Sequence, residues 1–175
     1  MSSSYTAFID SGIGGVSVLA DARRLLPWEN FIYFGDVLNA PYGSKTTEEV
    51  MLLLKQNIEL LISTYSLKAI LLACNTATAA AVEQIRQNMV LPILGMEPAL
   101  KPAVEQTAGQ IVVLGTELTL REQKFQALLA ATASAREVVL LPCPGLMEII
   151  EEGPQNIKAR DYLMTILNPY RRSAQ

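Results

Sequence analysis

Short apolar runs alternate with stretches of helical periodicity along the whole chain. The runs at 69–73 and 111–114 carry no polar position, which is typical of parallel strands covered by helices on both faces. Shorter runs predict four further strands, of which the one at 92–94 is the weakest. These four strands cover residues 7–9, 31–34, 92–94 and 138–141.

Between the strands, apolar positions recur three and four residues apart, which predicts helices packed against a sheet. Pro27 ends the first helical stripe, because proline cannot continue a helix. Thr46 and Glu49 have the spacing of a capping box before the second. The helical stripes cover residues 18–26, 50–62, 77–88, 119–131 and 162–167.

Alternation of strands and helices predicts an open α/β fold, with parallel sheets and flanking helices. The pattern restarts near Gly95-Met96-Glu97-Pro98, so we expect two lobes, formed by residues 1–95 and residues 96–175. In open α/β sheets, ligands bind beyond the carboxyl ends of the strands. The residues that follow each strand are therefore the candidates for chemistry.

The composition excludes several classes of function. Of the 175 residues, 50% are hydrophobic and 18% are charged, so we expect a folded chain. The net charge of −3 comes without a basic cluster larger than a pair, so we expect no nucleic-acid partner. Without histidine, Ser-His-Asp hydrolysis, Cys-His proteolysis and His-ligated zinc are excluded. Two cysteines cannot form a four-thiolate metal site, and we expect no metal.

The sequence also predicts a compartment. The segment Met1–Thr6 lacks the basic and apolar regions of a secretion signal. No apolar run approaches the length of a membrane span, so we expect no membrane partner. Cys74 and Cys143 fit reduced thiols better than a lone disulfide bond. We therefore expect a cytoplasmic protein.

A glycine-rich segment, Asp10-Ser11-Gly12-Ile13-Gly14-Gly15, follows the first predicted strand. Glycines that open a helix allow backbone N–H groups to converge on an anion. The segment also matches half of a dinucleotide fingerprint, with Asp36 where a ribose-binding acid would lie. Because Ser17 replaces the third glycine, a nucleotide site and a plain strand-to-helix turn both remain open on this pattern.

Cys74 stands where the third predicted strand gives way to a helix, and Asn75 and Thr76 follow it. A helix N-terminus lowers the pKa of a thiol, and the thiolate is the reactive form. A cysteine that only fills space needs no polar neighbours, so this position indicates chemistry. We expect Cys74 to be the more reactive cysteine. Cys143 has a proline on each side, which predicts a turn.

Two further strands are followed by segments that could contact a ligand. Residues 39–44 contain a Pro-Tyr-Gly turn after the second strand, and Thr116 and Thr119 follow the strand at 111–114. A turn that feeds the next helix explains the first segment, and helix N-capping explains the threonines. Both segments are also candidates for ligand contacts, because loops at strand ends reach the ligand crevice.

Taken together, these segments resemble glutamate racemase, the cofactor-independent enzyme that supplies D-glutamate for bacterial peptidoglycan. The matching segments are Asp10–Gly15, Tyr33–Asp36, Asn39–Ser44, Ala73–Ala79, Glu97–Ala99 and Gly115–Thr116. The resemblance covers essentially the whole chain, and it explains the glycine half-match without a nucleotide. Asp10-Ser11 and Pro41-Tyr42-Gly43 favour glutamate over the aspartate and hydantoins of related racemases.

The resemblance implies two α/β lobes with glutamate bound between them, and no cofactor. Members of this family use two cysteines on opposite faces of the α-carbon, one to remove a proton and one to deliver it. The resemblance implies that Cys74 is one of these two groups. The substrate contacts that it implies are Asp10, Ser11, Pro41, Tyr42, Gly43, Asn75, Thr76, Thr116, Thr119 and Glu151.

The sequence departs from the family pattern in one respect. The second cysteine of the family lies in a Gly-Cys-Thr-His-Tyr-Pro segment, which this sequence does not contain. We therefore expect a C-terminally truncated racemase with impaired activity, in which Cys143 does not replace the second cysteine. The alternatives are a remnant that binds only a dicarboxylate or a partner protein, and a nucleotide-binding α/β module. An open lobe or sheet edge would favour a homo-oligomer.

Overall fold

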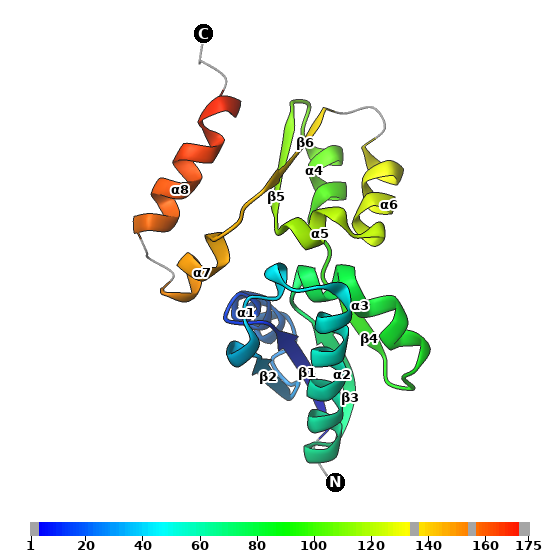
Figure 1. Cartoon of the computed structure of the whole chain (residues 1–175). Helices are drawn as coiled ribbons and strands as arrows, with labels where there is room; N and C mark the ends of the chain where they lie inside the picture. The colour runs from blue at the N-terminus through cyan, green and yellow to red at the C-terminus, as the bar shows by residue number, and fades with distance from the viewer. Residues whose placement is uncertain (1–3, 134–136, 154–156, 172–175) are drawn as a thin grey trace.

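The computed structural model describes residues 4–133, 137–153 and 157–171 (Figure 1). The strands are β1 (Tyr5–Asp10), β2 (Phe31–Gly35), β3 (Leu67–Leu72), β4 (Ile93–Gly95), β5 (Ile111–Gly115) and β6 (Val138–Pro142). The α-helices are α1 (Gly15–Leu25), α2 (Thr47–Thr64), α3 (Asn75–Gln87), α4 (Leu100–Gln106), α5 (Glu117–Arg121), α6 (Gln123–Thr132), α7 (Leu146–Glu151) and α8 (Ile157–Leu167). The 3₁₀ turns are η1 (Val37–Asn39), η2 (Tyr42–Ser44) and η3 (Asn168–Tyr170).

The strands form two parallel sheets. The first has the order β2-β1-β3-β4, and the second pairs β5 with β6. Every strand predicted from the apolar runs is present, and the predicted α/β class with parallel sheets is confirmed. The segment Met1–Thr6 lacks the features of a secretion signal. Its residues 1–3 lie outside the described residues.

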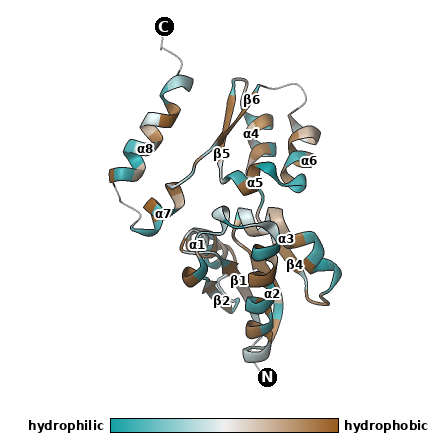
Figure 2. Cartoon of the chain, viewed as in Figure 1, coloured by the Kyte–Doolittle hydropathy of each residue, from teal (hydrophilic) through white to brown (hydrophobic). Residues whose placement is uncertain are grey.

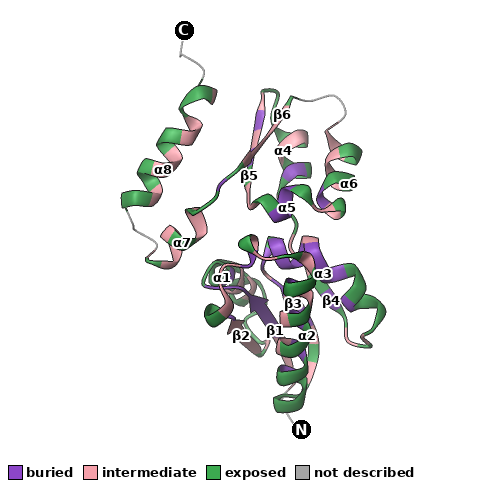
Figure 3. Ribbon diagram, viewed as in Figure 1, coloured by how far each residue is buried: buried purple, intermediate pink, exposed green. Residues whose placement is uncertain are grey.

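The core of the first sheet lies against α2 and α3. Ala7 and Ile9 of the central strand β1 are fully buried in one apolar cluster with Val50, Leu54 and other residues of these helices. Phe8 points to the opposite face, where its ring packs edge-on against Phe31 with centroids 5.5 Å apart. Figure 3 shows burial along β1 and α3, as expected for a central strand covered on both faces.

The second sheet has an apolar cluster of its own. It contains Leu100 from α4, Ile111 and Val113 from β5, and Phe125 from α6. Leu118 of α5 packs instead into the cluster of the first sheet, so α5 joins the two halves. Two sheets and two clusters support the predicted lobes at 1–95 and 96–175, and this division remains a prediction. Residues 134–136, 154–156 and 172–175 of the predicted second lobe lie outside the described residues.

The helix predicted over 119–131 is wrong, because the structure breaks it into α5 and α6. Glu122 lies between them in extended conformation, with φ −60° and ψ 141°. Its carboxylate accepts a hydrogen bond from the Thr47 hydroxyl of α2. The Gln126 side-chain amide also donates to the Leu120 carbonyl at 2.5 Å. The Glu122 carboxylate thus contacts α2, which is distant in sequence, so the local apolar period could not reveal this break.

The other elements follow local signals more closely. The capping box before α2 is confirmed, since Thr46 Oγ1 accepts from the Glu49 amide at 3.2 Å and Glu49 Oε2 accepts from the Thr46 amide at 2.7 Å. The short helices α4 and α7 were not predicted from the apolar pattern. Figure 2 shows apolar residues along the strands and mixed polarity along α8. Within the described ranges, no helix has the length and hydropathy needed to cross a membrane.

Gly15 marks the closest packing at the start of α1. A Cβ at this position would lie 2.7 Å from the Ala73 Cβ and 3.1 Å from the Asp10 Cβ. We expect Gly15→Ala to lower the free energy of unfolding by about 1–3 kcal/mol, because these neighbours cannot move without shifting β1 and β3. Gly109→Ala is the matched control, since a Cβ there meets nothing within 4 Å. Urea denaturation measures both, and equal stability of the two variants would contradict this prediction.

Candidate active site

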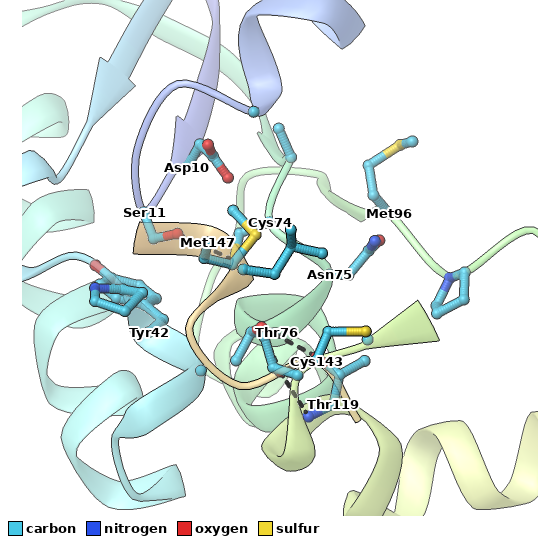
Figure 4. Close-up of a pocket in the computed structure, with 18 of the residues that line it drawn as sticks. Asp10, Ser11, Tyr42, Cys74, Asn75, Thr76, Met96, Thr119, Cys143 and Met147 are labelled. Carbon is cyan, nitrogen blue, oxygen red and sulfur yellow. Dashed lines mark hydrogen bonds between the residues drawn. The ribbon is translucent and has the colours of Figure 1, made fainter. Parts of the chain in front are cut away.

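A cavity of about 370 Å³ lies where the carboxyl ends of β1 and β3 face those of β5 and β6 (Figure 4). Strand ends of open α/β sheets are where ligands bind. The wall of the cavity contains the predicted residues Asp10, Ser11, Pro41, Tyr42, Gly43, Cys74, Asn75, Thr76, Thr116 and Thr119. The structure therefore brings together every predicted site residue except Glu151, and their roles remain predictions.

The Asp10 carboxylate holds the glycine-rich loop in place. Its Oδ2 accepts hydrogen bonds from the Gly12 amide at 3.2 Å, the Gly15 amide at 3.1 Å and the Tyr33 hydroxyl at 3.3 Å. The Tyr33 hydroxyl also lies 2.7 Å from the Gly12 carbonyl oxygen, to which it can donate. Burial and the nearby Asp10 charge raise the pKa of Tyr33, so this phenol keeps its proton. The loop is thus folded around a carboxylate of the chain itself.

Glu151 of α7 lies on the outer side of the same loop. Its Oε1 accepts a hydrogen bond from the Ile13 amide at 3.1 Å, and a Cβ on Gly12 would collide with this carboxylate. The predicted substrate contact at Glu151 is not among the residues that line the cavity. Its observed partner shows instead that Glu151 ties α7 to the glycine-rich loop.

These contacts argue against the nucleotide alternative. A phosphate in a glycine-rich loop needs free backbone N–H groups. The Gly12 and Gly15 amides donate to Asp10, and the Ile13 amide donates to Glu151. Asp36, the candidate for a ribose contact, is buried, and its carboxylate accepts hydrogen bonds from side chains of the chain. Internal partners therefore occupy the groups that a dinucleotide would use.

Cys74 lies at the N-terminus of α3 and is 7% exposed. Its Sγ accepts a hydrogen bond from the Ala77 amide at 3.4 Å and lies 3.6 Å from the Ser11 hydroxyl. Burial nevertheless raises the pKa of the Cys74 thiol, and the Asp10 charge adds to this effect. The amides of Ala77 and Thr76 at the start of α3 lower this pKa, as expected, but desolvation outweighs their effect and the net direction is upward.

Three threonine hydroxyls connect the two sides of the cavity. Thr76 lies in the first turn of α3, whereas Thr116 and Thr119 lie at the start of α5. The Thr76 oxygen lies 3.1 Å from that of Thr116 and 3.0 Å from that of Thr119, and the last two oxygens are 2.9 Å apart. Thr116 Oγ1 also accepts from the Thr119 amide, as the capping interpretation predicts. This threonine cluster brings two segments about forty residues apart into one wall.

The Pro41-Tyr42-Gly43 turn forms the wall beside the threonine cluster. Tyr42 is 1% exposed, and its hydroxyl donates to Asp36 Oδ2 at 2.6 Å. A Cβ on Gly43 would lie 2.6 Å from the Thr116 Cβ. Glycine is therefore required here for a close approach between the turn and α5.

Cys143 also lines the cavity, from the segment that follows β6 (Figure 4). The prolines on either side predicted a turn, and the structure in addition buries this thiol. Its S–H donates to the Leu141 carbonyl at 3.3 Å, and burial raises the pKa of the thiol. Both cysteines are free thiols, as expected for a reduced pair.

Several apolar lining residues were missed by sequence analysis. Met96 follows β4, so its position at a strand end could have indicated it. Leu146 and Met147 of α7 reach the cavity only because α7 folds back toward the first sheet, and no local signal predicts this. Within residues 4–133, 137–153 and 157–171, no group of three or more His, Cys, Asp or Glu side chains is placed to hold a metal ion.

The fold and the cavity define a class of protein: a two-sheet α/β protein with a cavity at the strand ends that is lined by two thiols and a buried carboxylate. Solved structures share this fold. The chain is similar to the Escherichia coli glutamate racemase in complex with L-glutamate and activator UDP-MurNAc-Ala, with a TM-score of 0.89 and 29% identity. The match covers 99% of this chain and 66% of that chain.

The family model for Asp/Glu/Hydantoin racemase matches residues 34–174, and the chain belongs to this family. It is 53% identical over 148 residues to the glutamate racemase of Clostridium novyi (strain NT), covering 83% of this chain and 57% of that protein. It is 47% identical over 165 residues to that of Clostridium acetobutylicum, covering 93% of this chain and 64% of that protein. The chain therefore spans less than two thirds of these curated relatives.

Because burial raises the pKa of Cys74, its reactivity should depend strongly on pH. In a Cys143→Ser background, we expect slow alkylation of Cys74 by iodoacetamide at pH 7, rising through a pKa above the ordinary value of about 8.5. Ser11→Ala should raise that pKa further, since it removes a hydrogen bond that favours the thiolate. Rates measured from pH 6 to pH 10 test this, and a half-maximal rate below pH 8.5 would contradict it.

Proposed function

We propose that this chain is a glutamate racemase in which Cys74 is one of the two proton-transfer groups. The observation that carries the proposal is the position of the Cys74 thiol on the wall of the cavity, beside Ser11 and the N-terminus of α3. Membership in the Asp/Glu/Hydantoin racemase family supports it. The Escherichia coli relative with bound L-glutamate supports the choice of substrate.

The cavity offers groups that suit the carboxylates of glutamate. Asn75 and Thr76 stand at the start of α3, a helix of 13 residues whose N-terminus favours negative charge. In the structure, the hydroxyls of the threonine cluster form hydrogen bonds with one another. Each hydroxyl can rotate to donate its proton to a carboxylate oxygen of the substrate. These donors bind the substrate and also stabilise charge that moves onto its α-carboxylate during proton removal.

Because the pKa of Cys74 is raised, the bound substrate must itself favour the thiolate form. Burial and the Asp10 charge both disfavour the thiolate in the cavity. A bound amino acid carries an ammonium group, and a positive charge near Asp10 and Cys74 lowers the pKa of the thiol. Substrate binding therefore helps to generate the base that the reaction needs.

The chemistry then follows from the position of one thiolate. Cys74 takes the α-proton, and the electron pair of the broken C–H bond moves onto the α-carboxylate. Inversion requires a second group that delivers a proton to the opposite face. In the family resemblance, that group belongs to a segment that the present sequence does not contain. The 175-residue chain by itself should therefore return the proton to the face from which Cys74 removed it.

Incubation with each glutamate enantiomer in deuterated buffer tests this proposal. We expect slow incorporation of deuterium at the α-carbon of one enantiomer, with retained configuration. Racemisation should be slower than exchange by about 10²–10⁴-fold, the usual contribution of one positioned acid or base. Cys74→Ser should abolish the exchange while leaving glutamate binding measurable by calorimetry.

Two outcomes would contradict this assignment. Exchange that persists in Cys74→Ser would show that another group removes the proton. Binding of glutamate by the parent chain without any exchange would leave dicarboxylate binding as its function.

The threonine cluster provides a separate test of substrate binding. Thr119→Val removes one hydroxyl from the cluster and preserves the shape of the side chain. We expect the dissociation constant for glutamate to rise about tenfold, since a hydrogen bond to a charged group is lost. Thr107→Val is the matched control, because Thr107 is exposed and its hydroxyl donates only to the Ala103 carbonyl. Equal affinities of the two variants in calorimetry would show that the cluster does not bind the substrate.

A further inference from the structure

Asp36 is a buried carboxylate that the proposed proton transfer does not use. It follows β2 and is 6% exposed. Its Oδ2 accepts hydrogen bonds from the Tyr42 hydroxyl at 2.6 Å and the Asn57 amide at 3.0 Å. Its Oδ1 accepts from the Asn39 amide at 2.8 Å. A buried charge with this many donors is held in one orientation.

Tyr42 is the member of this network that reaches the cavity. The Asn57 amide lies 3.2 Å from the Tyr42 hydroxyl and 3.0 Å from Asp36 Oδ2, so it closes a triangle of polar atoms. Asp36 and Asn57 do not line the cavity, whereas Tyr42 and the adjoining Pro41 and Gly43 do. The network therefore acts on the cavity through the tyrosine ring.

The turn that carries Tyr42 also sets the contact between the two halves of the site. Gly43 packs directly against Thr116, with no room for a Cβ. Thr116 is a member of the threonine cluster that joins α3 to α5. A shift of the Tyr42 ring would thus move the turn against α5 and change the shape of the cavity.

We propose that Asp36 and Asn57 are positioning residues that fix Tyr42 and, through it, the Pro41–Gly43 wall of the cavity. That glutamate is the ligand of this wall rests on the proposed function; the positioning itself rests on the contacts described above.

The charge on Asp36 is part of this arrangement. Burial opposes the charged form, but the hydrogen bonds from Tyr42, Asn57 and Asn39, together with the charge of Lys45, lower the pKa of Asp36 below its usual value. The carboxylate therefore stays ionised as the pH falls toward 5. Loss of the Tyr42 or Asn57 donor raises this pKa, so protonation at low pH should weaken the remaining contacts.

The test compares Asn57→Leu and Tyr42→Phe with the unmodified chain and with Tyr65→Phe. Leucine is close in shape to asparagine, and Asn57 does not line the cavity, so an effect on binding must pass through its neighbours. Tyr65 is 43% exposed and packs against Tyr5, away from the cavity, so it serves as the control tyrosine. Thermal unfolding verifies that each variant is folded at the temperature used.

Calorimetry with D- and L-glutamate between pH 8 and pH 5 gives the first readout. We expect Asn57→Leu and Tyr42→Phe each to raise the dissociation constant about tenfold at pH 8, and the double variant to match either single one. The ratio of variant to parent constants should grow as the pH falls. Comparison with the parent at each pH removes the titration of glutamate itself.

Alkylation of Cys74 in a Cys143→Ser background gives a second readout that needs no glutamate. A displaced wall should expose the buried thiol, so both variants should react faster than the parent and Tyr65→Phe should not. Faster alkylation in a chain that binds no glutamate would support the positioning and contradict the proposed function. Unchanged affinity, pH dependence and alkylation in both variants would overturn the positioning, whatever the parent binds.

Discussion

The site depends on one constraint: polar groups that leave water at the junction of the two sheets must find partners within the chain. Among the described residues, no buried side-chain nitrogen or oxygen atom lacks a hydrogen bond. The threonine cluster meets this constraint between α3 and α5, and Asp36 meets it beneath the Tyr42 turn. An unsatisfied group in either place would cost about 1–3 kcal/mol. The partners therefore fix the distance between the two walls of the cavity.

The same burial controls the chemistry of the thiols. Cys74 stands at a helix N-terminus, a position that by itself favours a thiolate. The cavity wall removes it from water, and the nearby carboxylate of Asp10 is also engaged in shaping the glycine-rich loop. Desolvation outweighs the effect of the helix start, so burial favours the neutral thiol.

Much of the fold could be predicted from sequence. The apolar run at 111–114 forms a strand whose Ile111 and Val113 are buried in the second apolar cluster, and the Thr46–Glu49 spacing caps α2 as its residues predict. The break at Glu122 could not be predicted, since it depends on a hydroxyl of α2. In the site, strand ends indicated Cys74 and the Tyr42 turn. They could not indicate Met147, which reaches the cavity only through the path of α7.

By itself, the sequence determined the order of the strands, the residue types at each strand end and the family that those segments resemble, because these depend on neighbouring residues and on residue type. Tertiary structure alone decided three other features. It placed Cys143 on the wall of the cavity and brought the Glu151 carboxylate to the Ile13 amide. It also buried Cys74, which raises the pKa of this thiol although the start of α3 lowers it. Each of these results from contacts or burial between distant segments, and desolvation in particular has no local signature in a sequence.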